Sequence, residues 1–146
     1  MLEFSERAPA NEEPFAWMRD RAERALDEAS ADTVVVIGKS LASAAAPLVA
    51  ERGLPAVWLT PLLTRPEVAS ALAASTAPAL LVGSTADATW ADGEQPRGDA
   101  IAVVELAGLD HSLQVRGDPL ASLDVLRQVT ERIARFLASV AHFGGP

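Results

Sequence analysis

Ser40, Asp87 and His111 of this 146-residue chain could together perform nucleophilic chemistry. A serine hydroxyl is a weak nucleophile until a neighbouring base removes its proton, and an imidazole held by a carboxylate is a suitable base. Each of the three residues follows an apolar run that predicts a strand of a parallel sheet. Because functional groups in such sheets gather beyond the carboxyl ends of the strands, we expect the three side chains to lie together.

Ser40 is predicted to lie at a sharp turn between a strand and a helix. The β-branched run over residues 34–37 predicts a buried strand, and the alanine-rich segment after Ser40 predicts a helix. Small residues, Gly38 and Ala42, stand two positions before and two after the serine, where the backbones of a tight turn come close together. This is the spacing of a nucleophile elbow, with alanine in place of the usual second glycine. The helix N-terminus would direct its free N–H groups toward an anion beside Ser40.

The tripeptide Gly38-Lys39-Ser40 before a helix also resembles the end of a phosphate-binding loop. Such a loop requires a glycine five residues before the second one, and that position is Thr33. Because residues 33–37 are predicted to be strand, no loop is left to surround a phosphate. We therefore exclude this motif.

Strands and helices are predicted to alternate along the chain and to position these residues. The predicted strands cover residues 33–37, 55–60, 78–83 and 101–106. The predicted helices cover residues 14–29, 41–51, 66–74 and 119–140, and the segment 88–99 is the least regular. Short connections between alternating elements favour βαβ units. The sequence therefore predicts one α/β domain over residues 1–146, a three-layer fold with a mostly parallel sheet of about four strands and helices on both faces.

The two ends and the last helix carry further expectations. Residues 1–13 are an acidic lead-in in which residues 2–4 fit a short strand, and residues 144–146 predict a flexible tail. The last helix is expected to turn one apolar stripe inward, made of Leu120, Leu123, Leu126, Val129, Ile133, Leu137 and Val140.

Composition excludes several classes of function. The net charge is −8 and no cluster of Lys or Arg occurs, which argues against nucleic acid and anionic membranes as partners. The absence of cysteine excludes disulfides and thiol catalysis, and two histidines are too few for most zinc sites. No apolar stretch is long enough for a membrane helix, and the first residues lack the pattern of a secretory signal. We expect a cytoplasmic protein without a cofactor or a metal.

The chain resembles the α/β-hydrolase superfamily, in particular its small bacterial serine hydrolases. The resemblance covers roughly residues 14–140. Its motifs are the elbow Gly38-Lys39-Ser40-Leu41-Ala42, the segment Leu81-Val82-Gly83-Ser84-Thr85-Ala86-Asp87 followed by Trp90, and Leu109-Asp110-His111-Ser112-Leu113 ahead of a long helix. The order of serine, acid and histidine is that of the superfamily.

The resemblance implies hydrolysis of a carboxylic ester or a related acyl bond of a small-molecule substrate. Ser40 would form an acyl-enzyme, His111 would act as the base and Asp87 would orient it. The backbone N–H of Leu41 would be one donor of the oxyanion hole. Superfamily members begin with further strands, and a loop among these supplies a second donor; this chain resembles only the C-terminal two-thirds of the fold. The alternative function is that of a non-catalytic, hydrolase-like domain that binds small molecules or self-associates.

Other residues leave alternatives open. Asp92 and Asp99 are rivals to Asp87 as the acid, whereas Asp110 is interpreted as a turn former. Several apolar residues could line an acyl pocket or simply pack in the core, namely Trp58, Leu62, Leu63, Trp90 and Leu113.

The strand that precedes Ser40 would lack a neighbouring strand on one side. In the complete fold this strand is central, but here residues 33–37 would present an apolar edge without a neighbour. Such an edge is a template for aggregation, and residues 2–4 are too few to cover it. We therefore expect a homodimer or a partner chain on that side, and this neighbour could supply the second oxyanion donor.

Overall fold

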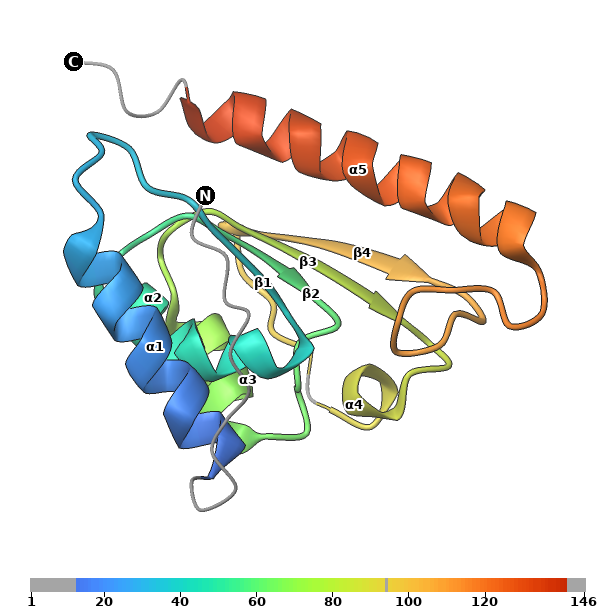
Figure 1. Ribbon diagram of the computed structural model, residues 1–146, viewed down its shortest axis with the longest axis horizontal. Helices are drawn as coiled ribbons and strands as arrows, with labels where there is room; N and C mark the ends of the chain where they lie inside the picture. Colours follow the sequence, from blue (N-terminus) through green and yellow to red (C-terminus); the bar gives the residue numbers. More distant parts are fainter. Residues whose placement is uncertain (1–12, 94, 142–146) are drawn as a thin grey trace.

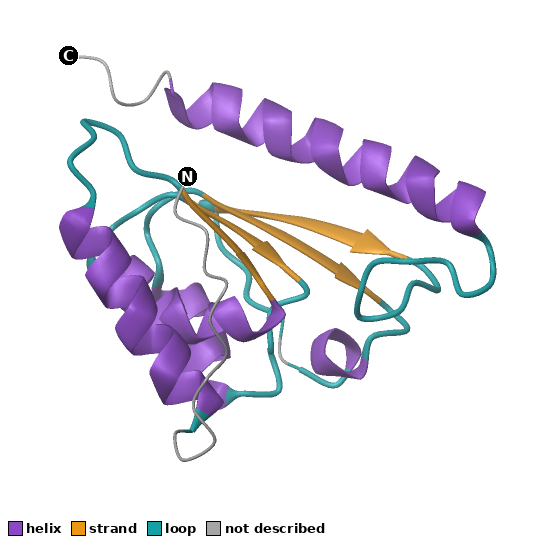
Figure 2. Cartoon of the chain, viewed as in Figure 1, coloured by secondary structure: helices purple, strands orange, loops and turns teal. Residues whose placement is uncertain are grey.

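The computed structural model describes residues 13–93 and 95–141 (Figures 1 and 2). In chain order the elements are α1 (Pro14–Glu28), β1 (Val36–Lys39), the 3-10 helix η1 (Ser40–Ala45), α2 (Ala46–Glu51), β2 (Ala56–Leu59), α3 (Pro66–Ala74), β3 (Ala79–Ser84), α4 (Ala88–Ala91), β4 (Ile101–Leu106) and α5 (Pro119–Ala141). The strand expected at residues 2–4 and the tail expected at 144–146 lie outside the described residues.

The four strands form one parallel sheet in the order β1-β2-β3-β4. Val36 pairs with Ala56, Ala56 with Ala79, and Ala79 with Ile101, so the strands begin in register. The expected parallel sheet of about four strands is confirmed. All four carboxyl ends lie at one edge of the sheet (Figure 2).

Helices cover both faces of the sheet, which confirms the three-layer α/β fold (Figure 1). One core lies between the sheet and the helices that precede α5, and it is built around Trp58, Leu81 and Trp90. The second core lies between the sheet and α5, where Val57 and Val82 meet the helix. Neighbouring strand residues such as Val57 and Trp58 enter opposite cores because side chains alternate across a sheet.

The first helix and the elbow segment show how local sequence sets the element ends. The Glu13 side chain accepts a hydrogen bond from the Ala16 N–H at 2.8 Å, and proline occupies the first turn of α1. After Ser40 the chain forms η1 and then α2, in place of the continuous helix predicted over 41–51. Pro47 explains the division, because a residue without an N–H is tolerated in the first turn of a helix and α2 begins at Ala46.

The bounds of β1 differ from the prediction over residues 33–37. The strand begins at Val36 and continues through Gly38 and Lys39, because these are the residues that find partners on β2. A pairing partner, rather than the apolar run, therefore sets the strand. Also unpredicted is α4, a short helix within residues 88–99 that Asp87 caps through the Thr89 N–H.

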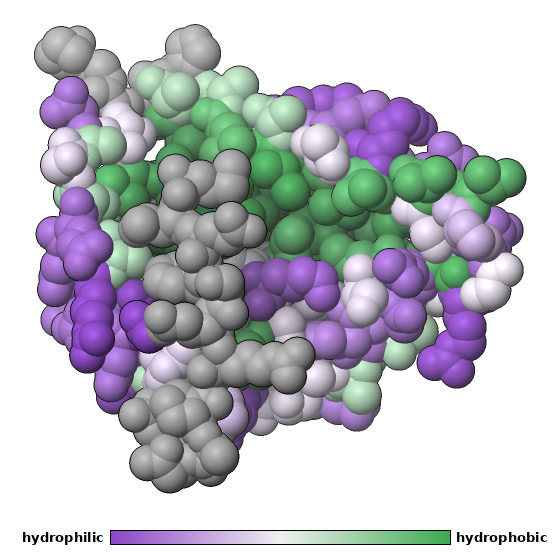
Figure 3. Space-filling view, viewed as in Figure 1, coloured by the Kyte–Doolittle hydropathy of each residue, from purple (hydrophilic) through white to green (hydrophobic). Residues whose placement is uncertain are grey.

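The apolar stripe of α5 is only partly buried. Val129 and Val140 are buried as expected, but Leu120, Leu123 and Leu126 are 76%, 60% and 60% exposed. The first turns of α5 extend past the tips of β3 and β4 (Figure 1), and Leu120, Leu123 and Leu126 lie outside the second core. Figure 3 shows hydrophobic residues continuing to that end of the molecule. The expectation that all seven residues face the core is therefore wrong for the first three.

No helix among the described residues combines the length and the apolar character needed to cross a lipid bilayer.

Candidate active site

Ser40 lies directly after β1, at the turn where the strand passes into η1. Its φ is +51°, a left-handed conformation that is uncommon for a residue other than glycine and concentrates at functional sites. Gly38 makes room for this turn: a Cβ there would lie 2.5 Å from Trp58 Cζ3 and 3.2 Å from Ala42 Cβ. The close approach expected between Gly38 and Ala42 is thus present, and the ring of Trp58 crowds the same position even more.

Ser43 fixes the backbone of the turn. Its hydroxyl donates to the Ser40 carbonyl at 2.7 Å and accepts from the Leu62 N–H at 3.1 Å. The Ser43 side chain is fully buried, so these bonds join η1 to the loop after β2. We did not predict Ser43 as a site residue, and its position three residues after Ser40, within hydrogen-bonding reach of that carbonyl, was the available signal.

The loop that carries His111 is anchored from two sides. On one side, the Ser84 hydroxyl at the end of β3 donates to the Leu109 carbonyl at 2.8 Å and accepts from the Leu109 N–H at 2.9 Å. On the other, Lys39 Nζ donates to the His111 carbonyl at 3.2 Å. Asp110 Oδ1 accepts from the N–H of Ser112 at 2.9 Å, so Asp110 shapes the turn, as interpreted from the sequence.

The structure brings Ser40, Asp87 and His111 together. His111 Nε2 lies 2.6 Å from Ser40 Oγ, and His111 Nδ1 lies 2.8 Å from Asp87 Oδ2. The Asp87 side chain is 3% exposed and the His111 side chain 39%, so the acid is buried while the imidazole faces the solvent in part. The rival acids Asp92 and Asp99 are both exposed.

Asp87 is held as a carboxylate. Burial by itself would raise its pKa, but hydrogen bonds from His111 and Thr89, together with the charge interaction with His111, lower the pKa below its ordinary value. An ionised carboxylate only accepts hydrogen bonds, so Nδ1 of His111 carries a proton. In the neutral imidazole the lone pair then lies on Nε2, toward the hydroxyl of Ser40.

Thr89 is a further member of this network that sequence reasoning missed. Its Oγ1 donates to Asp87 Oδ1 at 2.8 Å and lies 3.3 Å from His111 Nδ1. Its backbone N–H also bonds to Asp87 Oδ1, at 3.0 Å. The signal was an Asp followed two positions later by Thr at the end of a strand, a pattern typical of an aspartate that caps its own turn.

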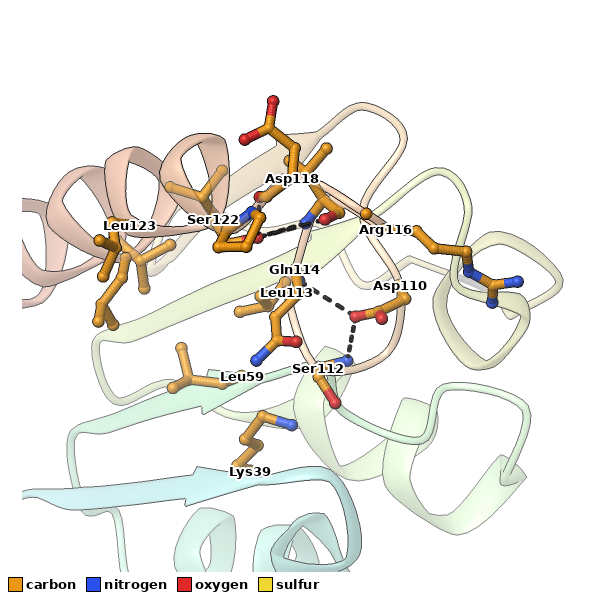
Figure 4. Close-up of a pocket in the computed structure, with 16 residues that line it drawn as sticks. Lys39, Leu59, Asp110, Ser112, Leu113, Gln114, Arg116, Asp118, Ser122 and Leu123 are labelled. Carbon is orange, nitrogen blue, oxygen red and sulfur yellow. Dashed lines mark hydrogen bonds between the residues drawn. The ribbon is translucent and has the colours of Figure 1, made fainter.

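The residues expected to line an acyl pocket do not share one cavity within the described chain. Leu63 and Trp90 are buried in the core, and the Trp90 Nε1–H donates to Glu105 Oε2 at 2.9 Å. The role of Leu62 here is its backbone bond to Ser43. Leu113, with φ +64°, lines a different cavity, of about 760 Å³, against α5 (Figure 4).

That cavity lies beside the proposed catalytic residues without including them. Its lining contains Lys39 and Asp110, the neighbours of Ser40 and His111 in sequence, but neither of those two residues themselves. Its walls come from Leu59, from the loop over residues 112–118 and from the first turns of α5 (Figure 4). The cavity therefore belongs to the α5 face of the sheet.

Two further features bear on the chemistry available at this edge. Leu41 follows Ser40 in η1, and an N–H in the first turn of a helix has no acceptor within the helix. Within residues 13–93 and 95–141, no group of three or more His, Asp or Glu is placed to hold a metal ion. The site as described supports proton transfer from the Ser40 hydroxyl to an imidazole.

Comparison of the chain with protein-family models gave no match, and a search among curated proteins gave no significant match.

Proposed function

We propose that this protein is a serine hydrolase that cleaves a carboxylic ester or a related acyl bond, in keeping with its resemblance to the α/β-hydrolases. The observation that carries the proposal is the continuous series of short contacts from Asp87 Oδ2 through both nitrogens of His111 to Ser40 Oγ, at 2.8 and 2.6 Å. The left-handed turn at Ser40 supports the same assignment, because it presents the hydroxyl at the carboxyl edge of the sheet.

In the proposed reaction, Ser40 Oγ attacks the acyl carbon while His111 Nε2 accepts the hydroxyl proton. The tetrahedral intermediate collapses to an acyl-serine, and the leaving alkoxide takes the proton back from His111. Water then gives a proton to His111 and attacks the acyl-serine, which releases the carboxylic acid and restores the Ser40 hydroxyl. Asp87 stabilises the imidazolium of both steps, and Thr89 helps to hold Asp87.

The oxyanion would accept a hydrogen bond from the Leu41 N–H. Among the described residues this is the one donor that we assign. Because the loss of one donor typically slows acyl transfer by about 10²–10³-fold, we expect turnover to be slower than in an enzyme with two donors. The substrate is proposed to be a small molecule, and the cytoplasmic location stays a prediction of the sequence.

Labelling with a fluorophosphonate tests the proposal, since this reagent requires an activated serine but no known substrate. We expect intact-mass spectrometry to show one adduct on the wild-type chain and none on Ser40→Ala or His111→Ala. Ser112→Ala is the matched control: Ser112 lies in the same loop as His111 and is exposed, and this variant should label like wild type. If saturating reagent leaves the wild type unmodified, the hydrolase proposal fails and the non-catalytic alternative is favoured.

A further inference from the structure

The face of the sheet that carries α5 is covered over only part of its width. Strands lie about 4.8 Å apart and helices pack at about 8–10 Å from each other, so a four-stranded sheet accommodates two helices side by side. Within the described residues, α5 and the loop residues Leu109, Leu113 and Val115 form the second core over strand side chains that include Val82 and Val104. On β1, at the other end of the sheet, Ile37 is 53% exposed. On β2 the neighbouring Val57 is fully buried, so the uncovered part of this face lies over β1.

Ile37 lies on the same face of β1 as Lys39, and Lys39 lines the 760 Å³ cavity, which extends to the first turns of α5. Leu59 of the sheet and Leu126 of the helix line the cavity, and Leu123 projects from α5 beside it (Figure 4). Figure 3 shows this region as a continuous hydrophobic band below α5. A contiguous apolar surface of this kind differs from the scattered apolar residues of an ordinary surface and marks an interaction site. We call it the α5 groove, defined by Ile37, Leu59, Leu113, Leu123 and Leu126.

We propose that a second copy of this chain covers the α5 groove, with the first two turns of each α5 inserted into the groove of the other protomer. The groove requires an apolar helix, and the first two turns of α5 are one. Leu120, Leu123 and Leu126 follow each other at three-residue spacing and therefore pass from the outward side of the helix to the flank that faces the groove. One such helix end would contact a neighbouring helix and a second sheet at the same time.

The contact is self-complementary, as a two-fold dimer requires. Each protomer offers both the groove and the helix end that fills it, so one symmetric interface removes both apolar surfaces from water. Beyond Leu126 the outward side of α5 becomes polar, and Arg127 Nη1 pairs with Glu131 Oε1 at 2.6 Å. The inserted part is therefore limited to the first two turns.

The charges around the groove do not oppose this contact. Two cationic and two anionic side chains line the cavity, namely Lys39, Arg116, Asp110 and Asp118. The chain as a whole carries −8, so the acidic excess lies elsewhere on the protein. Like charges across an interface suppress association, and the balanced groove avoids them.

The oligomeric state tests the proposal independently of any activity. In sedimentation or light scattering at micromolar concentration, the wild type should have twice the chain mass of 15.3 kDa. Leu123→Glu and Leu126→Glu should each be monomeric, because they place a charge in the interface. Gln128→Glu is the matched control: it adds the same charge at an exposed position on the opposite flank of α5, and it should remain dimeric.

Cross-linking gives a second measurement, which the absence of cysteine makes clean. Ile37→Cys and Leu123→Cys chains, mixed and oxidised, should form a disulfide-linked heterodimer, whereas Ile37→Cys mixed with Gln128→Cys should not. A wild-type monomer at these concentrations would overturn the proposal. A dimer that persists in Leu123→Glu and Leu126→Glu, or that is lost equally in Gln128→Glu, would also overturn it.

Discussion

At the carboxyl edge of the sheet, one chain supplies the hydrogen-bond partners of most buried polar groups. At the α5 groove, one chain leaves large apolar side chains exposed to solvent. At the edge, Ser43, Ser84 and Asp87 are buried, and each has its hydrogen-bond partners within the described residues. In the groove, Ile37 and Leu123 remain more than half exposed. The difference has a physical cause. A buried polar group without a partner costs about 1–3 kcal/mol at once, whereas apolar surface can be covered later by association.

One residue at the edge departs from this pattern. Thr60, directly after β2, is fully buried with φ +44°, and its Oγ1 has no hydrogen-bond partner among the described residues. Left-handed backbone is rare for a β-branched residue. The edge is therefore complete around Asp87 but strained one strand away.

The substitution with the largest expected effect removes the charge of Asp87 at the edge and leaves the packing there intact. Asp87→Asn should slow the labelling of Ser40 by about 10⁴-fold, because an amide does not hold His111 in the productive tautomer. The melting temperature should fall only by what the ionised form of Asp87 contributes, since asparagine caps a helix as well as aspartate does and Asp87 caps α4. Labelling kinetics and thermal unfolding measure the two effects.

Asp92→Asn and Asp99→Asn serve as controls, because both positions are exposed and should leave the labelling rate unchanged. A wild-type rate in Asp87→Asn would remove Asp87 from the proposed mechanism.

The next effect disturbs the packing beneath the edge. Gly38→Ala would place a Cβ 2.5 Å from Trp58 Cζ3, so the Trp58 ring or the backbone at residue 38 must move. Overpacking of this kind lowers the free energy of unfolding by about 1–3 kcal/mol, and we expect that loss in chemical denaturation together with slower labelling of Ser40. In Gly98→Ala the nearest atom is Ile101 Cδ1 at 3.8 Å, so this control should unfold almost as wild type does. Equal stability of the two variants would contradict the role of Gly38.

The substitution with the smallest expected effect removes a single hydrogen bond, the one from the Thr89 hydroxyl to Asp87. Thr89→Val keeps the shape of the side chain but loses the hydroxyl that bonds to Asp87, and we expect labelling to slow by about tenfold, equivalent to about 1.4 kcal/mol. Thr76→Val, at an exposed position away from this network, should label normally.

The same variant should change the dependence of stability on pH. The pKa of Asp87 lies below its ordinary value in the folded chain, so its ionised form adds stability above about pH 3.9 that is lost as the pH falls through the folded pKa. Without the threonine hydroxyl the pKa moves back toward the ordinary value. The free energy of unfolding should therefore fall less between pH 4 and pH 2 in Thr89→Val than in the wild type; an identical fall would show that the hydroxyl does not act on Asp87.

Patterns of residues within one segment were sufficient for much of the fold. The runs at 66–74 and 101–106 match α3 and β4, because an apolar period and its flanking turn residues are local properties of the chain. The alternation of strands and helices predicted a parallel sheet, whose carboxyl ends lie at one edge. It therefore also predicted that Ser40, Asp87 and His111 lie together.

Other features depended on partners distant in sequence. Whether Thr33 or Val36 begins β1 is decided by the residues of β2 that are available to pair. That Thr89 also lies beside His111, 22 positions away, became visible only in the tertiary structure. The leucines of the first turns of α5 follow the same apolar period as Val129, but they lie outside the second core and remain exposed.

The sequence by itself determined the parallel α/β architecture and the three residues proposed for catalysis. The signals for both are the apolar periodicity, the small residues at a tight turn and the alternation of strands and helices, and each can be read from residues that are close together in the sequence. Tertiary structure alone decided the bond between Ser43 and the loop after β2, the approach of Thr89 to His111 and the exposure of the α5 groove. Each of these depends on a distance between segments or on the width of a sheet relative to its helices, and no local pattern encodes such a quantity.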